Sequence, residues 1–237
     1  MNRPATEEEL ETCKTALTLH DTVDPSSFVR YFFTLLSGTI PSEALEGAVI
    51  AELKIRGFRS AKLIGHGAHA LAGITPGNVV VKLTFDETDA VACMRVAGID
   101  FKNVADVHEA VILNPPDAWR PLGLIFQQYA DWPGLPRPGD DEDLDKLVSN
   151  QSYKHQVWRI FQRHVIGKEA EKIARKAVQS TVRLLKKDGR LEFLEIANGL
   201  QELMKHDVYV VDPNSENVSS TVDGMKLIDL GMSYTKP

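Results

Sequence analysis

Residues 210–231, VVDPNSENVSSTVDGMKLIDLG, place acidic and amide side chains at the ends of short apolar runs. Asp212 directly follows the run VYVV, whose β-branched and aromatic residues predict a buried strand. The runs NVSS and MKLI flank a turn signal at 222–224 and predict a hairpin with Asn217 at its start and Asp229 after its end. We therefore expect these oxygen ligands to lie close together, as Mg²⁺ requires. Taken singly, each aspartate is more simply explained as a turn or cap residue.

The composition is that of an ordinary soluble globular chain of 237 residues, and its net charge of -6 gives no general reason to expect nucleic-acid binding. The two cysteines, Cys13 and Cys93, have no paired spacing, so neither a disulfide framework nor a structural zinc site is expected. No apolar run approaches membrane-spanning length, and the acidic start MNRPATEEELE differs from a secretory signal peptide. We therefore expect a cytoplasmic protein without a membrane span. Delivery into a host cell by a route without a cleaved signal peptide is compatible with the same features.

The first 57 residues have the pattern of three helices. Thr6 and Glu9 match a capping box at the start of the first helix. The second helix, DPSSFVRYFFTLLSG, is expected to have a serine cap and to stop at Gly38, and the third, SEALEGAVIAELKIRG, to start at Ser42.

A change of pattern near residue 58 predicts a mostly antiparallel sheet of about five strands with one helix. The β-type runs AKLIG, HALAGI and NVVVKLTF come first, with the turn signal TPGN between the last two. DETDAVACMRVAG predicts the helix, and FKNVADVHEAVIL and PLGLIFQQYA predict two further strands.

The rest of the chain is mainly helical after a proline-rich acidic break, DWPGLPRPGDDED. Residues 144–206 predict two helices joined by the turn KKDGR. Large apolar residues of this segment are expected in the core: Trp158, Ile160, Phe161 and Val165.

An aspartate, an asparagine five residues later, a hairpin and then Asp-x-Gly resemble the catalytic core of the protein-kinase-like superfamily. DPNSEN, with Asp212 and Asn217, is similar to the catalytic loop, and DLG, with Asp229, is similar to the metal-binding motif. The resemblance implies that Asp212 acts as the catalytic base and that Asn217 and Asp229 hold Mg²⁺.

A lysine upstream fits the same family. Lys82 ends the apolar run VVVK, where a lysine is costly to bury without a partner. The resemblance implies that Lys82 is a catalytic residue that holds the α- and β-phosphates of ATP. A lysine that reaches solvent from an edge strand is the alternative.

The segment LIGHGAHALAG resembles the phosphate-binding loop between the first two strands. Gly65 and Gly67 would let backbone N–H groups approach phosphate oxygens closely, while Ala70 replaces the third glycine of the family pattern. Its two histidines, His66 and His69, are expected to be solvent-exposed loop residues.

The run LIFQQYA resembles the hinge of the family, about fifty residues after the lysine. Gln127 lies near the gatekeeper position. The resemblance implies that adenine meets the backbone of three residues: Gln128, Tyr129 and Ala130.

The chain also departs from the family pattern. The predicted helix after the lysine offers Glu87 and Asp89 as its acidic partner, and the choice stays open. Two valines stand in place of His-Arg before Asp212, which argues against control by a phosphorylated activation loop. Asn214 replaces the charged residue usual two positions after the catalytic aspartate. Only MSYTKP follows the DLG, so neither an activation segment nor an Ala-Pro-Glu motif is expected.

We therefore predict an α+β chain with a two-lobed, protein-kinase-like fold and a truncated C-lobe, similar to minimal atypical kinases of bacterial, effector or phage type. A helical N-terminal extension would cover 1–58, the N-lobe 59–130 and the minimal C-lobe 131–237. The expected reaction is transfer of the γ-phosphoryl group of ATP, with Mg²⁺, to a hydroxyl, a protein Ser or Thr being the first choice. A small-molecule kinase and a pseudokinase that binds nucleotide or a partner are the alternatives. The filled catalytic positions favour an enzyme, and the missing charges around Asp212 favour a pseudokinase.

Residues 154–190 carry eleven Lys or Arg against three acids. Such a run is usually a solvated helix face, and otherwise a docking surface for an acidic partner, anionic lipid or nucleic acid. We predict that it docks an acidic protein partner or substrate rather than nucleic acid, with Lys172, Arg175 and Lys176 as candidate contacts.

Overall fold

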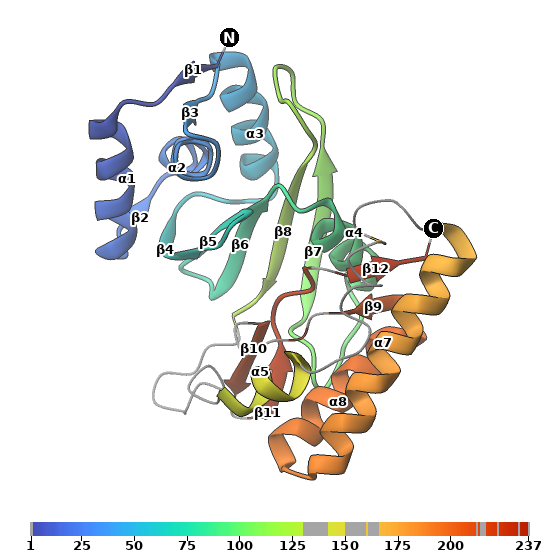
Figure 1. Ribbon diagram of the computed structural model, residues 1–237. Helices are drawn as coiled ribbons and strands as arrows, with labels where there is room; N and C mark the ends of the chain where they lie inside the picture. Colours follow the sequence, from blue (N-terminus) through green and yellow to red (C-terminus); the bar gives the residue numbers. More distant parts are fainter. Residues whose placement is uncertain are drawn as a thin grey trace. The chain divides into compact units, whose positions relative to one another are not determined.

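The computed structural model describes residues 2–129, 142–149, 160, 166–211, 213, 217–221, 223–231 and 233–236. In these residues the chain is a mixed α+β protein, as expected (Figure 1). It divides into two compact units: Met1–Ala90 with His108–Tyr129, and Val91–Val107 with Ala130–Pro237. The predicted domains 1–58, 59–130 and 131–237 stay a prediction, but the N-terminal helices belong to the same compact unit as the sheet.

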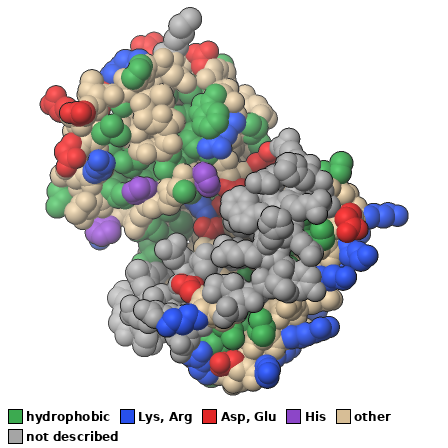
Figure 2. All heavy atoms as spheres, viewed as in Figure 1, with side chains coloured by type: hydrophobic (Ala, Val, Ile, Leu, Met, Phe, Trp, Pro, Cys, Tyr) green, Lys and Arg blue, Asp and Glu red, His purple; other side chains and the backbone are tan. Residues whose placement is uncertain are grey.

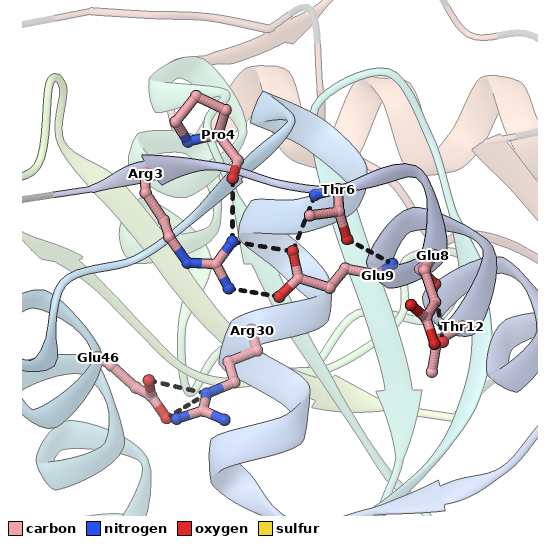
Figure 3. A network of polar contacts seen from close by, with 8 residues as sticks. All are labelled: Arg3, Pro4, Thr6, Glu8, Glu9, Thr12, Arg30 and Glu46. Carbon is pink, nitrogen blue, oxygen red and sulfur yellow. Dashed lines mark hydrogen bonds and ion pairs between the residues drawn. The ribbon is translucent and has the colours of Figure 1, made fainter.

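Three helices precede the sheet, with the caps that their sequences require. They are α1 (Glu7–Thr18), α2 (Pro25–Ser37) and α3 (Glu43–Ile55). The predicted capping box is present, because Thr6 accepts the Glu9 N–H at 3.2 Å while the Glu9 carboxylate accepts the Thr6 N–H at 2.8 Å. Figure 3 shows Arg3 bound to the same glutamate, and Arg30 of α2 bound to Glu46 of α3. The Arg30 Nε lies 3.0 Å from each oxygen of the Glu46 carboxylate.

Six strands form the main sheet, in the order β2-β4-β5-β6-β8-β7. Every neighbouring pair from β2 to β8 is antiparallel. The strands are β2 (Thr22–Val23), β4 (Ala61–His66), β5 (Ala70–Ile74), β6 (Val79–Thr84), β7 (Val107–Leu113) and β8 (Leu122–Gln128). Helix α4 (Glu87–Val96) follows β6, and a separate two-stranded ribbon joins β1 (Arg3–Pro4) to β3 (Thr39–Ile40).

One face of the sheet packs against the N-terminal helices (Figure 1). Phe28, Phe32 and Phe33 of α2 are fully buried against Val81 and Leu83 of β6 in a single apolar cluster. Fully burying each such side chain contributes about 1.5–3 kcal/mol. The helices are thus part of the core of the first unit rather than an appendage.

The second unit combines helices with short β-structures. Its helices are α5 (Glu142–Ser149), α7 (Gly167–Asp188) and α8 (Leu191–Lys205). Its strands are β9 (Val208–Val210) paired with β12 (Ser233–Thr235), and β10 (Val218–Thr221) paired with β11 (Gly224–Leu227). Two helices were predicted over 144–206, but the described residues of this range hold most of α5 as well as α7 and α8. Helices α7 and α8 pack side by side and are joined at the predicted turn, where Gly189 adopts a left-handed conformation (φ 84°).

Three further sequence-based expectations about elements were wrong in detail. The cap of α2 is Asp24 rather than a serine, because Pro25 occupies the first helical position and the Asp24 carboxylate accepts the Ser27 N–H at 2.8 Å. The sheet has six strands, because the two-residue β2 between α1 and α2 pairs with β4.

The third error concerns the segment FKNVADVHEAVIL, of which only Val107–Leu113 is a strand of the main sheet. Residues 103–105 hydrogen-bond instead to β11: the Leu227 N–H donates to the Asn103 carbonyl at 3.0 Å, and the Ala105 N–H donates to the Leu227 carbonyl at 2.8 Å. This tertiary pairing replaces the local strand that the sequence pattern predicts.

Candidate functional site

Lys82 forms a buried ion pair with Asp89. The Lys82 Nζ lies 2.7 Å from Asp89 Oδ2, and the two side chains are 11% and 2% exposed. Lys82 pairs with Ala72 of β5 on one side and Ile125 of β8 on the other, so it lies on an interior strand. The alternative of a solvent-reaching lysine on an edge strand is therefore wrong, and of the two acids left open, Asp89 is the partner while Glu87 is exposed.

The position of Asp89 follows from the short connection between β6 and α4. The Asp86 carboxylate accepts the Thr88 N–H at 2.9 Å and so caps the helix two residues after β6 ends. Asp89 then lies in the first turn of α4, where a negative charge interacts favourably with the helix dipole. Because the helix starts so near the strand, the short aspartate side chain reaches the lysine.

Lys82 lies on the face of the sheet opposite the N-terminal helices. Val81, Leu83 and Phe85 belong to the helix-packed cluster, and side chains alternate between faces along a strand. Gly123 of β8 lies on the Lys82 face, and a Cβ added there would come within 2.6 Å of the Ala90 Cβ of α4. The glycine therefore allows α4 to approach the sheet closely enough for the ion pair.

The predicted phosphate loop covers the end of β4, which contains Gly65, the turn with Gly67, and the start of β5 at Ala70. A hydrogen bond from the Gly67 N–H to the Ala70 carbonyl, 2.9 Å long, closes the turn. His66 and His69 are exposed, as expected. A Cβ at Gly65 or Gly67 would meet no atom within 4 Å, and neither glycine has a positive φ, so packing within this chain does not require glycine at either position.

The predicted hinge begins at the end of β8. Gln127 and Gln128 pair with Val80 and Val79 of β6, two and three residues from Lys82 along that strand. The Tyr129 N–H donates to the Asn78 carbonyl at 3.3 Å. Ala130 lies outside the described residues.

In the second unit, hairpin β10–β11 brings Asn217 and Asp229 to the same end. The register pairs Val218 with Leu227, and the Ile228 N–H donates to the Asn217 carbonyl at 2.9 Å, so Asp229 follows immediately. The Gly231 N–H donates to Asp229 Oδ1 at 2.7 Å and orients the carboxylate.

Gly224 is required at the turn of this hairpin. Its φ is 108°, and a Cβ there would lie 2.5 Å from the Glu195 carboxylate of α8. The same carboxylate accepts the Met225 N–H at 2.9 Å, which ties the hairpin to α8.

Several predicted residues lie outside the described residues: Asp212, Asn214, Trp158, Phe161 and Val165. Ile160 is buried, as predicted.

Among the described residues, no group of three or more His, Cys, Asp and Glu side chains is arranged to hold a metal ion. Within the same part of the chain, no helix has both the length and the apolar character needed to cross a membrane.

No protein-family model matches this sequence, and no curated protein matches it significantly.

Sequence reasoning missed the contribution of α8 to the basic surface. Arg175 of the predicted basic run lines a groove beside α8, whereas Lys172 and Lys176 do not line it. Arg183 and Lys187 of α7 also line the groove. Arg183 and Lys187 are four residues apart, and this spacing in the sequence indicates that they share one face of α7. The contribution of Lys205, in contrast, depends on how the two helices pack.

Proposed function

We propose that this protein is an ATP- and Mg²⁺-dependent kinase of a minimal, protein-kinase-like type, which transfers the γ-phosphoryl group to a protein Ser or Thr hydroxyl. One observation carries the proposal: the ion pair of Lys82 with Asp89, buried on an interior strand of an antiparallel sheet. A buried ion pair is weak evidence for stability, since two apolar residues would serve as well or better. Its presence is better explained by a functional lysine that must be held in place.

The loop between β4 and β5 supports a phosphate-binding role in the same unit. Gly65 and Gly67 fill no tight space and no left-handed backbone position, so an external group is a reason for their small size. Backbone N–H groups in such a loop can approach phosphate oxygens closely. In this proposal Lys82 holds the α- and β-phosphates, and Gln128, Tyr129 and Ala130 meet the adenine.

The residues proposed for Mg²⁺ fit a hard cation chemically. Asn217 and Asp229 supply amide and carboxylate oxygens at one end of the hairpin, and Asp229 is oriented by the Gly231 N–H. When bound, Mg²⁺ neutralises charge on the phosphates during transfer. Asp212 is proposed to orient the acceptor hydroxyl as a base, as the sequence resemblance implies.

Phosphoryl transfer can be tested with γ-labelled ATP and Mg²⁺, with and without a cell lysate as a source of acceptors. The wild-type chain should label itself or a lysate protein, and Asp212→Asn should lower turnover by roughly 10²–10⁴ because a positioned base is lost. Nucleotide affinity should be nearly unchanged in this variant.

The outcomes separate the alternatives. Label on a small molecule rather than on protein would identify a small-molecule kinase. ATP binding without transfer to any acceptor would leave a pseudokinase, and near wild-type turnover of Asp212→Asn would reduce Asp212 to a structural turn residue.

A further inference from the structure

A cationic groove of about 820 Å³ runs between α7 and α8. Of the nine described residues that line it, five are basic and none is acidic; the basic residues are Arg175, Arg183, Lys186, Lys187 and Lys205. Figure 2 shows Lys and Arg side chains gathered over the region where Figure 1 places these two helices. The positive charge is therefore concentrated in a concavity of an otherwise acidic chain.

The two walls of the groove come from different helices. Arg175, Gln179, Arg183 and Lys187 repeat every four residues along one face of α7, and Lys205 faces them from α8. The α7 row runs from Arg175 to Lys187, a rise of ~18 Å along the helix. A groove of this length accommodates a segment of about three helical turns.

Among the residues that the structure describes, three of the basic side chains have no partner. Arg175 is bound to Glu171 at 3.0 Å, and Lys186 donates to Gln201 at 2.7 Å. No ion pair or hydrogen bond joins Arg183, Lys187 or Lys205 to any described side chain. Like charges held close together repel one another, and an acidic ligand would relieve that repulsion.

The groove also has apolar surface. Val182 is buried at 5% exposure, and Met204 is partly buried beside it. Methionine adapts its shape to apolar side chains of different size. A ligand that matches this lining has carboxylates along its length and an apolar side chain to place on Val182 and Met204.

We propose that this groove docks an acidic amphipathic helix of a partner protein, with carboxylates on Arg183, Lys187 and Lys205 and an apolar side chain on the floor. A helix laid in a groove between two others is a recurring mode of peptide recognition. Single-stranded nucleic acid fits less well, because it is usually held by aromatic stacking and none of the described residues that line the groove is aromatic. A lipid surface would meet the rim of a concavity rather than its apolar floor.

The test is fluorescence anisotropy of a labelled acidic peptide of about twelve residues, the length that spans the α7 row. The peptide carries Asp and Glu on one face and two Leu on the other. The full-length chain without ATP should bind it, and raising the salt from about 0.05 to 0.5 M should weaken binding because the charges are screened. Replacing both Leu by Gln should weaken it further.

A matched pair of variants locates the site. Arg183→Glu with Lys187→Glu should weaken binding by at least about tenfold, and Lys205→Glu alone by a smaller factor. Lys172→Glu with Lys176→Glu makes the same change of charge on exposed residues of α7 outside the groove and should leave affinity within about twofold. Circular dichroism should show unchanged helix content in all of them.

Three results would overturn the proposal: no binding of the peptide, equal loss in the control pair, or an oligothymidylate or phosphatidylserine vesicle that binds more tightly than the peptide and loses affinity with the groove variants. Because binding is measured without nucleotide, none of these results depends on whether the chain is a kinase.

Discussion

The ion pair of Lys82 with Asp89 costs hydration free energy, and for that reason it is informative about function. Two charged side chains that are 11% and 2% exposed have lost most of their hydration, and their mutual attraction at 2.7 Å offsets that loss. Removing one member takes from the other buried charge its partner at 2.7 Å. A substitution of either residue alone is therefore expected to destabilise the fold.

Asp89→Ala should destabilise the protein by about 3–5 kcal/mol, because the buried Lys82 then loses the carboxylate that lies 2.7 Å from its Nζ. The double variant Lys82→Met with Asp89→Ala should recover most of that loss. Urea unfolding measures both, and Glu87→Ala, at an exposed position of the same helical turn, is the control that should stay within about 0.5 kcal/mol of wild type. An Asp89→Ala protein as stable as the control would mean that the ion pair is absent in solution.

Tyr209 gives a second prediction for a single residue. Burial raises the pKa of Tyr209 to about 12, although Arg175, which donates to its hydroxyl at 2.6 Å, acts in the opposite direction. A pKa raised above the unfolded value of 10.0 contributes stability that is fully present below pH 10 and is lost as the pH rises toward about 12. Tyr209→Phe should therefore flatten the fall of unfolding free energy in that window.

Denaturant midpoints between about pH 9 and 12 measure the effect. Tyr31 and Tyr234 also have raised pKa values through burial, so part of the slope should remain in Tyr209→Phe. A slope as steep as that of wild type would show that Tyr209 ionises normally in the folded state.

At the scale of elements, close contacts position α4 and hairpin β10–β11. Helix α4 reaches the sheet because Gly123 has no side chain, and the hairpin turns against α8 because Gly224 has none. Both glycines act by allowing a neighbouring element to approach. The position of Asp89 therefore depends on a residue in a strand that lies far from it in the sequence.

Gly123→Ala should lower stability by about 1–3 kcal/mol, since the new methyl group would lie 2.6 Å from Ala90 and 2.7 Å from Thr84 and force α4 away. It should also weaken nucleotide binding if the displacement separates Asp89 from Lys82. Gly77→Ala is the matched control, because the nearest atom to its new Cβ would be 3.8 Å away. Equal melting temperatures for the two variants would contradict the packing argument.

At the scale of the whole molecule, the chain divides into two compact units, and each contains residues with a proposed role. Lys82 and the β4–β5 loop belong to the first unit, and Asn217 and Asp229 belong to the second. The N-terminal helices are built into the first unit through a shared core. Removing residues 1–57 should therefore expose one face of the sheet rather than delete an independent domain.

ATP with Mg²⁺ should raise the melting temperature, because a ligand that binds only the folded state stabilises it. Lys82→Ala and Asp229→Ala should each reduce this shift, and Lys172→Ala, an exposed lysine on α7, should not. Differential scanning fluorimetry over a range of ATP concentrations measures the effect. An undiminished shift in both variants would remove these residues from the nucleotide site.

Much of the fold was predictable where local signals are strong. The capping box at Thr6, the stop at Gly38, the turn before Val79 and the hairpin after Asn217 each depend on a few neighbouring residues, and all four are present. The α+β class followed from these elements. The predicted cap of α2 was wrong because Pro25 takes the first helical position and Asp24 caps the helix. The full extent of the strand at 101–113 was wrong because residues 103–105 form backbone hydrogen bonds with Leu227 of β11 instead.

The sequence by itself determined which residues can carry chemistry, because a lysine in an apolar run or an asparagine before a hairpin is visible without a fold. Tertiary structure alone decided which of them meet. Asp89 rather than Glu87 pairs with Lys82, since the capped start of α4 and the missing side chain of Gly123 set the orientation and distance of the helix. Lys205 likewise joins the basic row of α7 only because α7 and α8 pack side by side. Such contacts depend on the packing of distant segments, which local propensity does not encode.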